Sequence, residues 1–207
     1  MAIGLFGGTF DPIHVGHLRI AEEVREHFNL ESVYFVPASV QPLKVQMRGA
    51  DGMDRMKMVK TAIRGNGFFK ASSLEIGRGG VSYTIDTIRA FHRDHGDIYF
   101  LVGMDAFRDV GLWKNYEELF RYTNFVVMAR PGYGRNVFPS AMKGNVQAIN
   151  HDTWEHTSGK RIYLHDITQL DISSTRIREL VRAGKSIKYL VPGSVERYIG
   201  KRGLYTN

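Results

Sequence analysis

The chain has 207 residues, of which 43% are hydrophobic and 12% aromatic, enough apolar material for a globular domain with a sizeable core. It contains no cysteine, which excludes disulfides, thiolate metal sites and cysteine nucleophiles. A formal net charge of +7 favours anionic partners, but the positive residues are spread along the chain without a charged tail. The charge therefore does not choose between nucleic acid and a small polyphosphate.

No apolar run approaches the length of a membrane span, and the first residues lack the basic segment of a signal peptide. We therefore expect a cytoplasmic protein without a membrane partner.

Short apolar runs alternate with helical patterns along the chain. We expect strands at 3–6, 33–36, 68–71, 98–102, 125–128 and, with the weakest pattern, 162–164. We expect helices at 16–28, from a cap at Asp51 or Asp54 to Ile63, and at 83–92, 174–183 and 195–199. The polar stretch 132–160 is expected to be an insertion or loop. The alternation predicts an α/β fold, a doubly wound parallel sheet of five to six strands with helices on both faces, in a single domain spanning 1–207.

The turn after the first expected strand is the first candidate site. Gly7 and Gly8 let a phosphate approach the backbone, and the following helix start presents free amides, although neither a Walker A loop nor a GxGxxG fingerprint is present. His14 and His17 lie on one side of the first helical turn, with Gly16 leaving room between them. As imidazolium groups they would donate to phosphate oxygens. The alternatives are capping or packing histidines, or a metal pair, for which no third ligand stands at a recognisable spacing.

The segment 7–17, GGTFDPIHVGH, resembles the signature of the nucleotidyltransferases that contain the HxGH motif. In that family a phosphate or phosphate ester attacks the α-phosphorus of a nucleoside triphosphate in line, and pyrophosphate leaves. The resemblance assigns His14 and His17 to triphosphate binding and transition-state stabilisation. It places Thr9 and Phe10 in the nucleotide pocket.

A second candidate site opens the expected helix at 174–183. Serine and threonine hydroxyls gather there with free amides, and Arg178 lies one turn in from Ser174, within reach of the same anion. Taken alone, the stretch also fits an ordinary cap followed by solvated arginines. It resembles the second signature of the same family, which matches Ile172, Ser173, Thr175, Ile177 and Arg178. The resemblance implies that Ser173, Thr175 and Arg178 bind the β- and γ-phosphates, so that the part from 173 to 207 completes the ATP site.

Both sites must meet at one crevice if they hold one triphosphate, which a parallel sheet allows. Mg²⁺ bridging the phosphates is the expected cofactor, and it needs few protein ligands of its own. We predict no metal site built from protein residues.

The middle of the chain carries the candidates for the acceptor site. Ser82–Thr87 would present amides and hydroxyls at a helix start, and Gly103 and Asp105 follow an expected strand. Trp113 offers a flat face to a cationic pyridinium ring. As isolated features, Trp113 also fits a core position and Asp105 a helix cap.

Together these segments resemble the family of bacterial nicotinate mononucleotide adenylyltransferases, and the match extends to Gly203-Leu204-Tyr205. The resemblance implies a Rossmann-like fold and the substrates ATP and nicotinate mononucleotide. It implies that Trp113 stacks on the pyridine ring, that Tyr83 and Thr84 lie beside its carboxylate, and that Asp105 binds a ribose hydroxyl. Lys44 is carried over as a phosphate contact, although Val40–Lys44 lacks the histidine of the family's Pro-Pro-His-Lys pattern.

Three alternatives remain. The acceptor could be nicotinamide mononucleotide or phosphopantetheine, but phosphopantetheine has no ring to stack on Trp113. A nucleotide-sensing or RNA-binding protein is disfavoured, because binding alone does not need the complete set of His14, His17, Ser173, Thr175 and Arg178. The sequence leaves a homo-oligomer open.

Overall fold

The computed structural model describes residues 2–42, 49–129, 139, 142 and 144–206. Its strands are β1 (Ile3–Gly8), β2 (Ser32–Pro37), β3 (Phe69–Ala71), β4 (Ile98–Gly103), β5 (Asn124–Ala129), β6 (Val146–Ala148), β7 (Thr153–His156) and β8 (Arg161–Asp166). Its helices are α1 (Val15–His27), α2 (Gly52–Ala62), α3 (Leu74–Arg78), α4 (Thr84–Asp94), α5 (Met104–Arg108), α6 (Tyr116–Tyr122), α7 (Ser174–Arg182) and α8 (Gly193–Arg202), with a 3₁₀ turn, η1, at Val110–Leu112. None of the helices in these ranges is long and apolar enough to cross a membrane.

The strands form one sheet in the order β3-β2-β1-β4-β5-β8-β7-β6. The first six of these are parallel, whereas β7 and β6 continue the sheet antiparallel. The chain builds from β1 outward to β3, then returns to place β4 on the other side of β1. In such a sheet, ligands bind beyond the carboxyl ends of the strands at the point where the winding reverses. That point lies between β1 and β4.

The side chains of the central strands β1, β2, β4 and β5 alternate between two hydrophobic cores, one on each face of the sheet. In β1, Ile3 and Leu5 point into the core under α4, α5 and α6, while Phe6 points into the core under α1, α2, α7 and α8. Because both faces are covered, the strands are near-continuous apolar runs, which is why they were visible in the sequence.

The predicted doubly wound α/β architecture is confirmed, but the sheet has eight strands rather than five or six. The two additional strands, β6 and β7, lie in the stretch 132–160 that was expected to be a loop. Neither β6 nor β7 contains a buried residue, so both lack the buried apolar run that marks β1, β2, β4 and β5.

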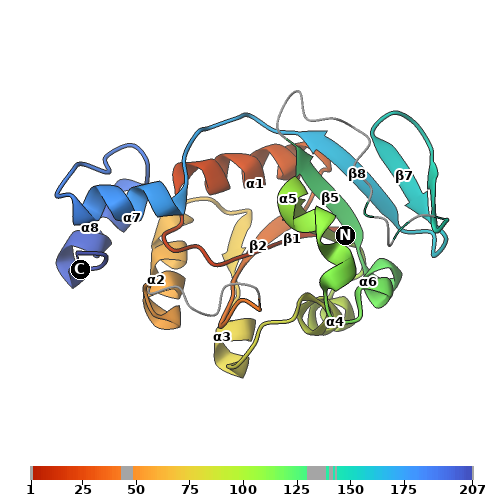
Figure 1. The fold of residues 1–207 in the computed structure, drawn as a ribbon, viewed down its shortest axis with the longest axis horizontal. Helices are drawn as coiled ribbons and strands as arrows, with labels where there is room; N and C mark the ends of the chain where they lie inside the picture. Colours follow the sequence, from red (N-terminus) through yellow and green to blue (C-terminus); the bar gives the residue numbers. More distant parts are fainter. Residues whose placement is uncertain (1, 43–48, 130–138, 140–141, 143, 207) are drawn as a thin grey trace.

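The two C-terminal helices lie together at one end of the molecule, away from β7 (Figure 1). Helix α8 is fastened to α2 by polar contacts: Ser194 Oγ donates to the Thr61 carbonyl at 3.0 Å, and Tyr198 Oη donates to Asp54 Oδ1 at 2.7 Å. Arg202 Nε adds a contact of 3.3 Å to the same Asp54 oxygen. The C-terminal part is therefore docked on the sheet's own helices.

Candidate active site

A cavity of about 240 Å³ opens at the carboxyl ends of β1 and β4, where the winding reverses. The predicted residues that line it are Gly7, Gly8, Tyr83, Thr84, Gly103 and Trp113. Candidates from three separate segments of the chain thus line one cavity.

Aromatic rings and a lysine form one wall of this cavity. The Trp113 ring is half-buried and stands edge-on to Phe100, with 6.2 Å between centroids and an angle of 87°. Lys114 lies beside it, with Nζ 4.5 Å above the Tyr83 ring and 3.3 Å from Asp86 Oδ2. The wall therefore contains an indole ring and a lysine whose charge is paired with Asp86.

The start of α4 is anchored by a buried carboxyl group. Glu75 accepts a hydrogen bond of 2.6 Å from Thr87 Oγ1 inside α4. Burial raises the pKa of Glu75, while bonds from Thr87 and Ser82 oppose the rise. Ser82 Oγ also accepts from the Ser39 amide at 2.9 Å, which ties the α4 start to the end of β2. Tyr83 and Thr84 are therefore held in place from behind.

The two histidines form a stacked pair at the N-terminus of α1. His14 is the N-cap residue and is 7% exposed, and its ring lies 3.7 Å from that of His17 at an angle of 26°. The His14 amide donates to His17 Nδ1 at 3.2 Å. His14 Nδ1 is buried and has no hydrogen-bond partner among the described residues. A buried nitrogen without a partner costs stability, as expected where a side chain is kept for a ligand.

Both imidazoles are neutral at pH 7 in this structure. Burial lowers the pKa of His14 from 6.5 to about 4, and burial together with the nearby His14 holds the pKa of His17 well below 6.5. The expected imidazolium pair is thus revised to two neutral rings. Because His17 Nδ1 accepts a hydrogen bond, its proton sits on Nε2, which leaves Nε2–H as a donor. A bound phosphate would raise both pKa values by its negative charge.

Phe10 and the glycines shape the space around the histidines. The Phe10 ring is 3% exposed and packs edge-on against His17 at 5.1 Å, so Phe10 supports the pocket from the core. A Cβ on Gly8 would lie 3.0 Å from that ring, and a Cβ on Gly16 would lie 3.1 Å from His14 Nδ1. Gly16 makes the predicted room, and Gly8 is needed for Phe10 as well as for any ligand.

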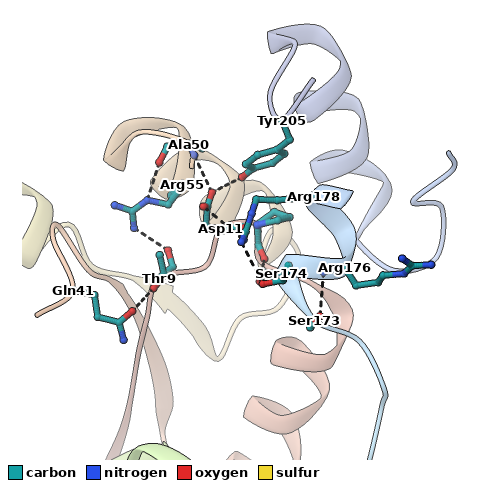
Figure 2. Close-up of polar contacts among 12 residues, drawn as sticks. Thr9, Asp11, Gln41, Ala50, Arg55, Ser173, Ser174, Arg176, Arg178 and Tyr205 are labelled. Atoms are coloured by element: carbon teal, nitrogen blue, oxygen red, sulfur yellow. Dashed lines mark hydrogen bonds and ion pairs between the residues drawn. The ribbon is translucent and has the colours of Figure 1, made fainter. Parts of the chain in front are cut away.

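Helix α7 is joined directly to the turn after β1, so the two predicted phosphate sites do converge (Figure 2). Ser174 Oγ donates to the Pro12 carbonyl at 2.9 Å, and Arg178 Nη1 donates to the Asp11 carbonyl at 2.7 Å.

Within the start of α7, Ser173 caps the helix by accepting from the Arg176 amide at 3.2 Å, and exposed Thr175 accepts from Arg178 Nη2 at 3.3 Å. Half-buried Ile172 packs against the core beneath. Arg178 is itself buried and already holds the turn.

Arg55, which the sequence did not single out, clamps the other side of the same turn. This buried guanidinium donates to the Thr9 carbonyl at 2.8 Å and to the Ala50 carbonyl at 3.2 Å (Figure 2). It also donates to the Ser39 carbonyl at 3.1 Å. Thr9 is fixed further by the bond from its Oγ1 to Gln41 Oε1 at 2.7 Å. Nothing in the spacing of α2 distinguishes Arg55 from a solvated arginine, so single-sequence reasoning had no signal for it.

Two predicted residues fall outside this assembly. Asp105 lies exposed in the first turn of α5 and does not line the cavity, whereas Asp109, one turn later, does. Lys44 lies outside the described residues.

The cytidylyltransferase-like family model matches residues 5–180. A probable nicotinate-nucleotide adenylyltransferase of Desulfatibacillum aliphaticivorans is 40% identical over 222 residues, covering 99% of this chain and all of that protein. One from Geotalea uraniireducens is 44% identical over 218 residues, covering all of this chain and 99% of that protein.

Solved structures share the fold at low sequence identity. A Plasmodium falciparum nicotinic acid mononucleotide adenylyltransferase complexed with NaAD aligns with a TM-score of 0.73 at 21% identity, over 99% of this chain and 97% of that one. A putative nicotinate-nucleotide adenylyltransferase from Vibrio parahaemolyticus aligns with a TM-score of 0.67 at 19% identity, over 100% and 96%.

Proposed function

The chain belongs to the nicotinate-nucleotide adenylyltransferases of the cytidylyltransferase-like family, and from this premise we propose that it transfers the adenylyl group of ATP to nicotinate mononucleotide. The products are deamido-NAD and pyrophosphate, which places the reaction in NAD biosynthesis. The observation that carries the proposal is the arrangement at the winding reversal. Gly7 and Gly8 line the cavity that has Trp113 on its wall, and the turn that follows them is bonded to the N-terminus of α7 through Ser174 and Pro12.

In the proposed reaction, a phosphate oxygen of the mononucleotide attacks the α-phosphorus of ATP. The bond from that phosphorus to the oxygen bridging to the β-phosphate breaks, and pyrophosphate carries that oxygen away. No protein nucleophile is needed, so positioning and charge stabilisation supply the rate enhancement. We assign the turn of Gly7, Gly8, Thr9 and Gly16, together with Ser173 and Thr175, to the triphosphate.

His14 and His17 stabilise the charge that develops on the phosphate oxygens. The Nε2–H of His17 is a preorganised donor, because the His14 amide occupies the other ring nitrogen. Arg178 contributes positive charge from its buried position beneath the turn, and its contacts to Asp11 and Thr175 keep the two halves of the phosphate site together.

The mononucleotide occupies the cavity. Trp113 stacks on the pyridine ring, while Tyr83 and Thr84, at the N-terminus of α4, lie beside the carboxylate. A helix N-terminus favours a negative group, which supports the acid over the amide. Gly103 lets the nucleotide approach the end of β4. We propose Asp105 as the contact to a ribose hydroxyl and Lys44 as a phosphate contact.

Enzymes of this kind use a divalent metal, and we propose Mg²⁺. The described residues contain no group of three or more His, Asp or Glu that could hold a metal ion. The ion is therefore proposed to arrive with ATP, held by phosphate oxygens and water. We also propose a single domain whose segment 173–207 completes the ATP site, acting in the cytoplasm.

Pyrophosphate release tests the function directly. The protein is mixed with ATP and Mg²⁺ and with nicotinate mononucleotide, nicotinamide mononucleotide or phosphopantetheine in turn. We expect fastest release with nicotinate mononucleotide and none with phosphopantetheine. No release with any acceptor would refute the proposal, and equal release with both mononucleotides would remove the preference for the acid.

A further inference from the structure

The nucleotide turn, residues 9–14 between β1 and α1, contains Asp11. The carboxylate of Asp11 faces the interior of the protein. Asp11 is 5% exposed, and its Oδ1 accepts from the Tyr205 hydroxyl at 2.6 Å and from the Ala50 amide at 3.0 Å (Figure 2). Its Oδ2 lies 3.8 Å from Arg178 Nη1. Both oxygens thus point at groups of the chain itself.

Gly49 closes the remaining side of this carboxylate. A Cβ built on Gly49 would lie 1.9 Å from Asp11 Oδ2, a distance that no side chain tolerates. The backbone therefore approaches the carboxylate as closely as packing allows, and Asp11 has no room for a substrate or a metal ion. Its four partners come from the segment before α2, from α7 and from beyond α8.

Tyr205 reaches Asp11 from the segment that follows α8. The helix ends at Gly203, which adopts the left-handed conformation, and the Leu204 amide donates to the Ile199 carbonyl at 3.1 Å. Tyr205 itself has a positive φ of 67°, which a bulky residue adopts only where its surroundings hold it. Burial and the Asp11 charge both raise the pKa of Tyr205, so its hydroxyl stays protonated and remains a donor.

We propose that Tyr205 is a positioning residue for ATP. Through Asp11 it fixes the turn at 9–14 and Arg178 in one arrangement, so that the amides of the turn and the N-terminus of α7 face the triphosphate together. Tyr205 does not touch the substrate. This inference rests on the proposed function in that it takes ATP as the ligand of the turn.

The molecule contains its own matched control. Tyr198 Oη donates to a buried carboxylate, Asp54, at 2.7 Å, nearly the distance of the bond from Tyr205 to Asp11. Both tyrosines lie in the C-terminal part, but the Tyr198 hydroxyl bonds Asp54 of α2 rather than a residue of the nucleotide turn. Tyr205→Phe and Tyr198→Phe each remove one phenolic donor from one carboxylate.

The test is calorimetric titration of each variant with MgATP in the absence of acceptor, followed by steady-state kinetics. A hydrogen bond to a charged group is worth about a tenfold change in an equilibrium constant. We expect Tyr205→Phe to weaken ATP binding about tenfold and to raise the KM for ATP by the same factor. The KM for nicotinate mononucleotide should change less than about twofold in Tyr205→Phe. In Tyr198→Phe, the KM for ATP and the KM for nicotinate mononucleotide should each change less than about twofold.

A second variant approaches the same bond from the other side. Asp11→Asn should also weaken ATP binding, and the double variant should bind no more weakly than Asp11→Asn within about twofold. If Tyr205→Phe fails to fold, the single variant Asp11→Asn still tests the bond, since it keeps the phenol in place.

Unchanged ATP binding in Tyr205→Phe, an equal loss in Tyr198→Phe, or additive losses in the double variant would each overturn the inference. Failure of the proposed function has a different signature. In that case the wild-type protein releases no pyrophosphate with any acceptor, whereas the difference in ATP binding between the two tyrosine variants persists.

Discussion

Replacing Arg55 by lysine keeps the charge but removes the planar fork. The guanidinium satisfies three backbone carbonyls with three different nitrogens, over distances of 2.8 to 3.2 Å, while only 5% exposed. A lysine ammonium places all its donors on one atom and cannot reach three acceptors that a fork spans. One or two of the three carbonyls would therefore stay buried without a hydrogen-bond donor.

Each orphaned acceptor costs about 1–3 kcal/mol, so Arg55→Lys should destabilise the fold by about 2–4 kcal/mol. For a chain of this size, 1 kcal/mol lowers the melting midpoint by about 2–4 °C. The expected shift is therefore roughly 5–15 °C downward. Because one freed carbonyl belongs to Thr9, the affinity for ATP should fall as well.

Differential scanning calorimetry measures the midpoint, with Arg176→Lys as the control. Arg176 is exposed and makes one ion pair, to Glu179 at 3.3 Å, so its replacement should shift the midpoint by no more than about 2 °C. If Arg55→Lys melts within the range of the control, the clamp on the turn contributes nothing and the reasoning from its three bonds is refuted.

Three further predictions concern the site. His17→Ala should lower kcat at least about 100-fold in the pyrophosphate assay, because one donor to the transition state is lost. A kcat near that of the wild type would mean that this ring plays no part in the transfer. Trp113→Ala should raise the KM for nicotinate mononucleotide about tenfold or more and leave the KM for ATP unchanged, since the loss is one stacking face; equal rises in both constants would contradict this. Because the folded-state pKa of His14, about 4, lies below its ordinary value of 6.5, the unfolded chain binds more protons as pH falls through that window. The contribution of His14 to the free energy of unfolding should thus be fully present above pH 6.5 and should be lost toward pH 4, by up to about 3 kcal/mol. Urea titrations should show a smaller decrease in the free energy of unfolding for His14→Asn than for the wild type.

The sequence predicted those parts of the fold that bury long apolar runs. The strands at both sides of the winding reversal were visible because they are covered on both faces, and α1 and α7 because their apolar residues recur at helical spacing. The short helices α3, α5 and α6 hold five to seven residues, too few for a period to emerge. Strand β7 has no buried apolar run to mark it.

The predicted site shows the same division. His14, His17 and Trp113 could be singled out as candidates because a short segment carries each pattern. Arg55 and Tyr205 act through contacts across the fold. Nothing in its own segment marks Arg55, and the family match at Gly203-Leu204-Tyr205 indicated no role for Tyr205. The protonation state of the histidines was missed for a related reason, because burial is a property of the packed structure.

The contacts that complete the nucleotide turn join distant parts of the chain, with sequence separations of 167 positions from Asp11 to Arg178 and 194 from Asp11 to Tyr205. Contacts of such high sequence separation must close very large loops, whereas β1 and β2 pair across the short connection that α1 spans. During refolding, the sheet should therefore regain its circular dichroism before the turn is locked. The capacity to bind ATP would then mark the last step of folding.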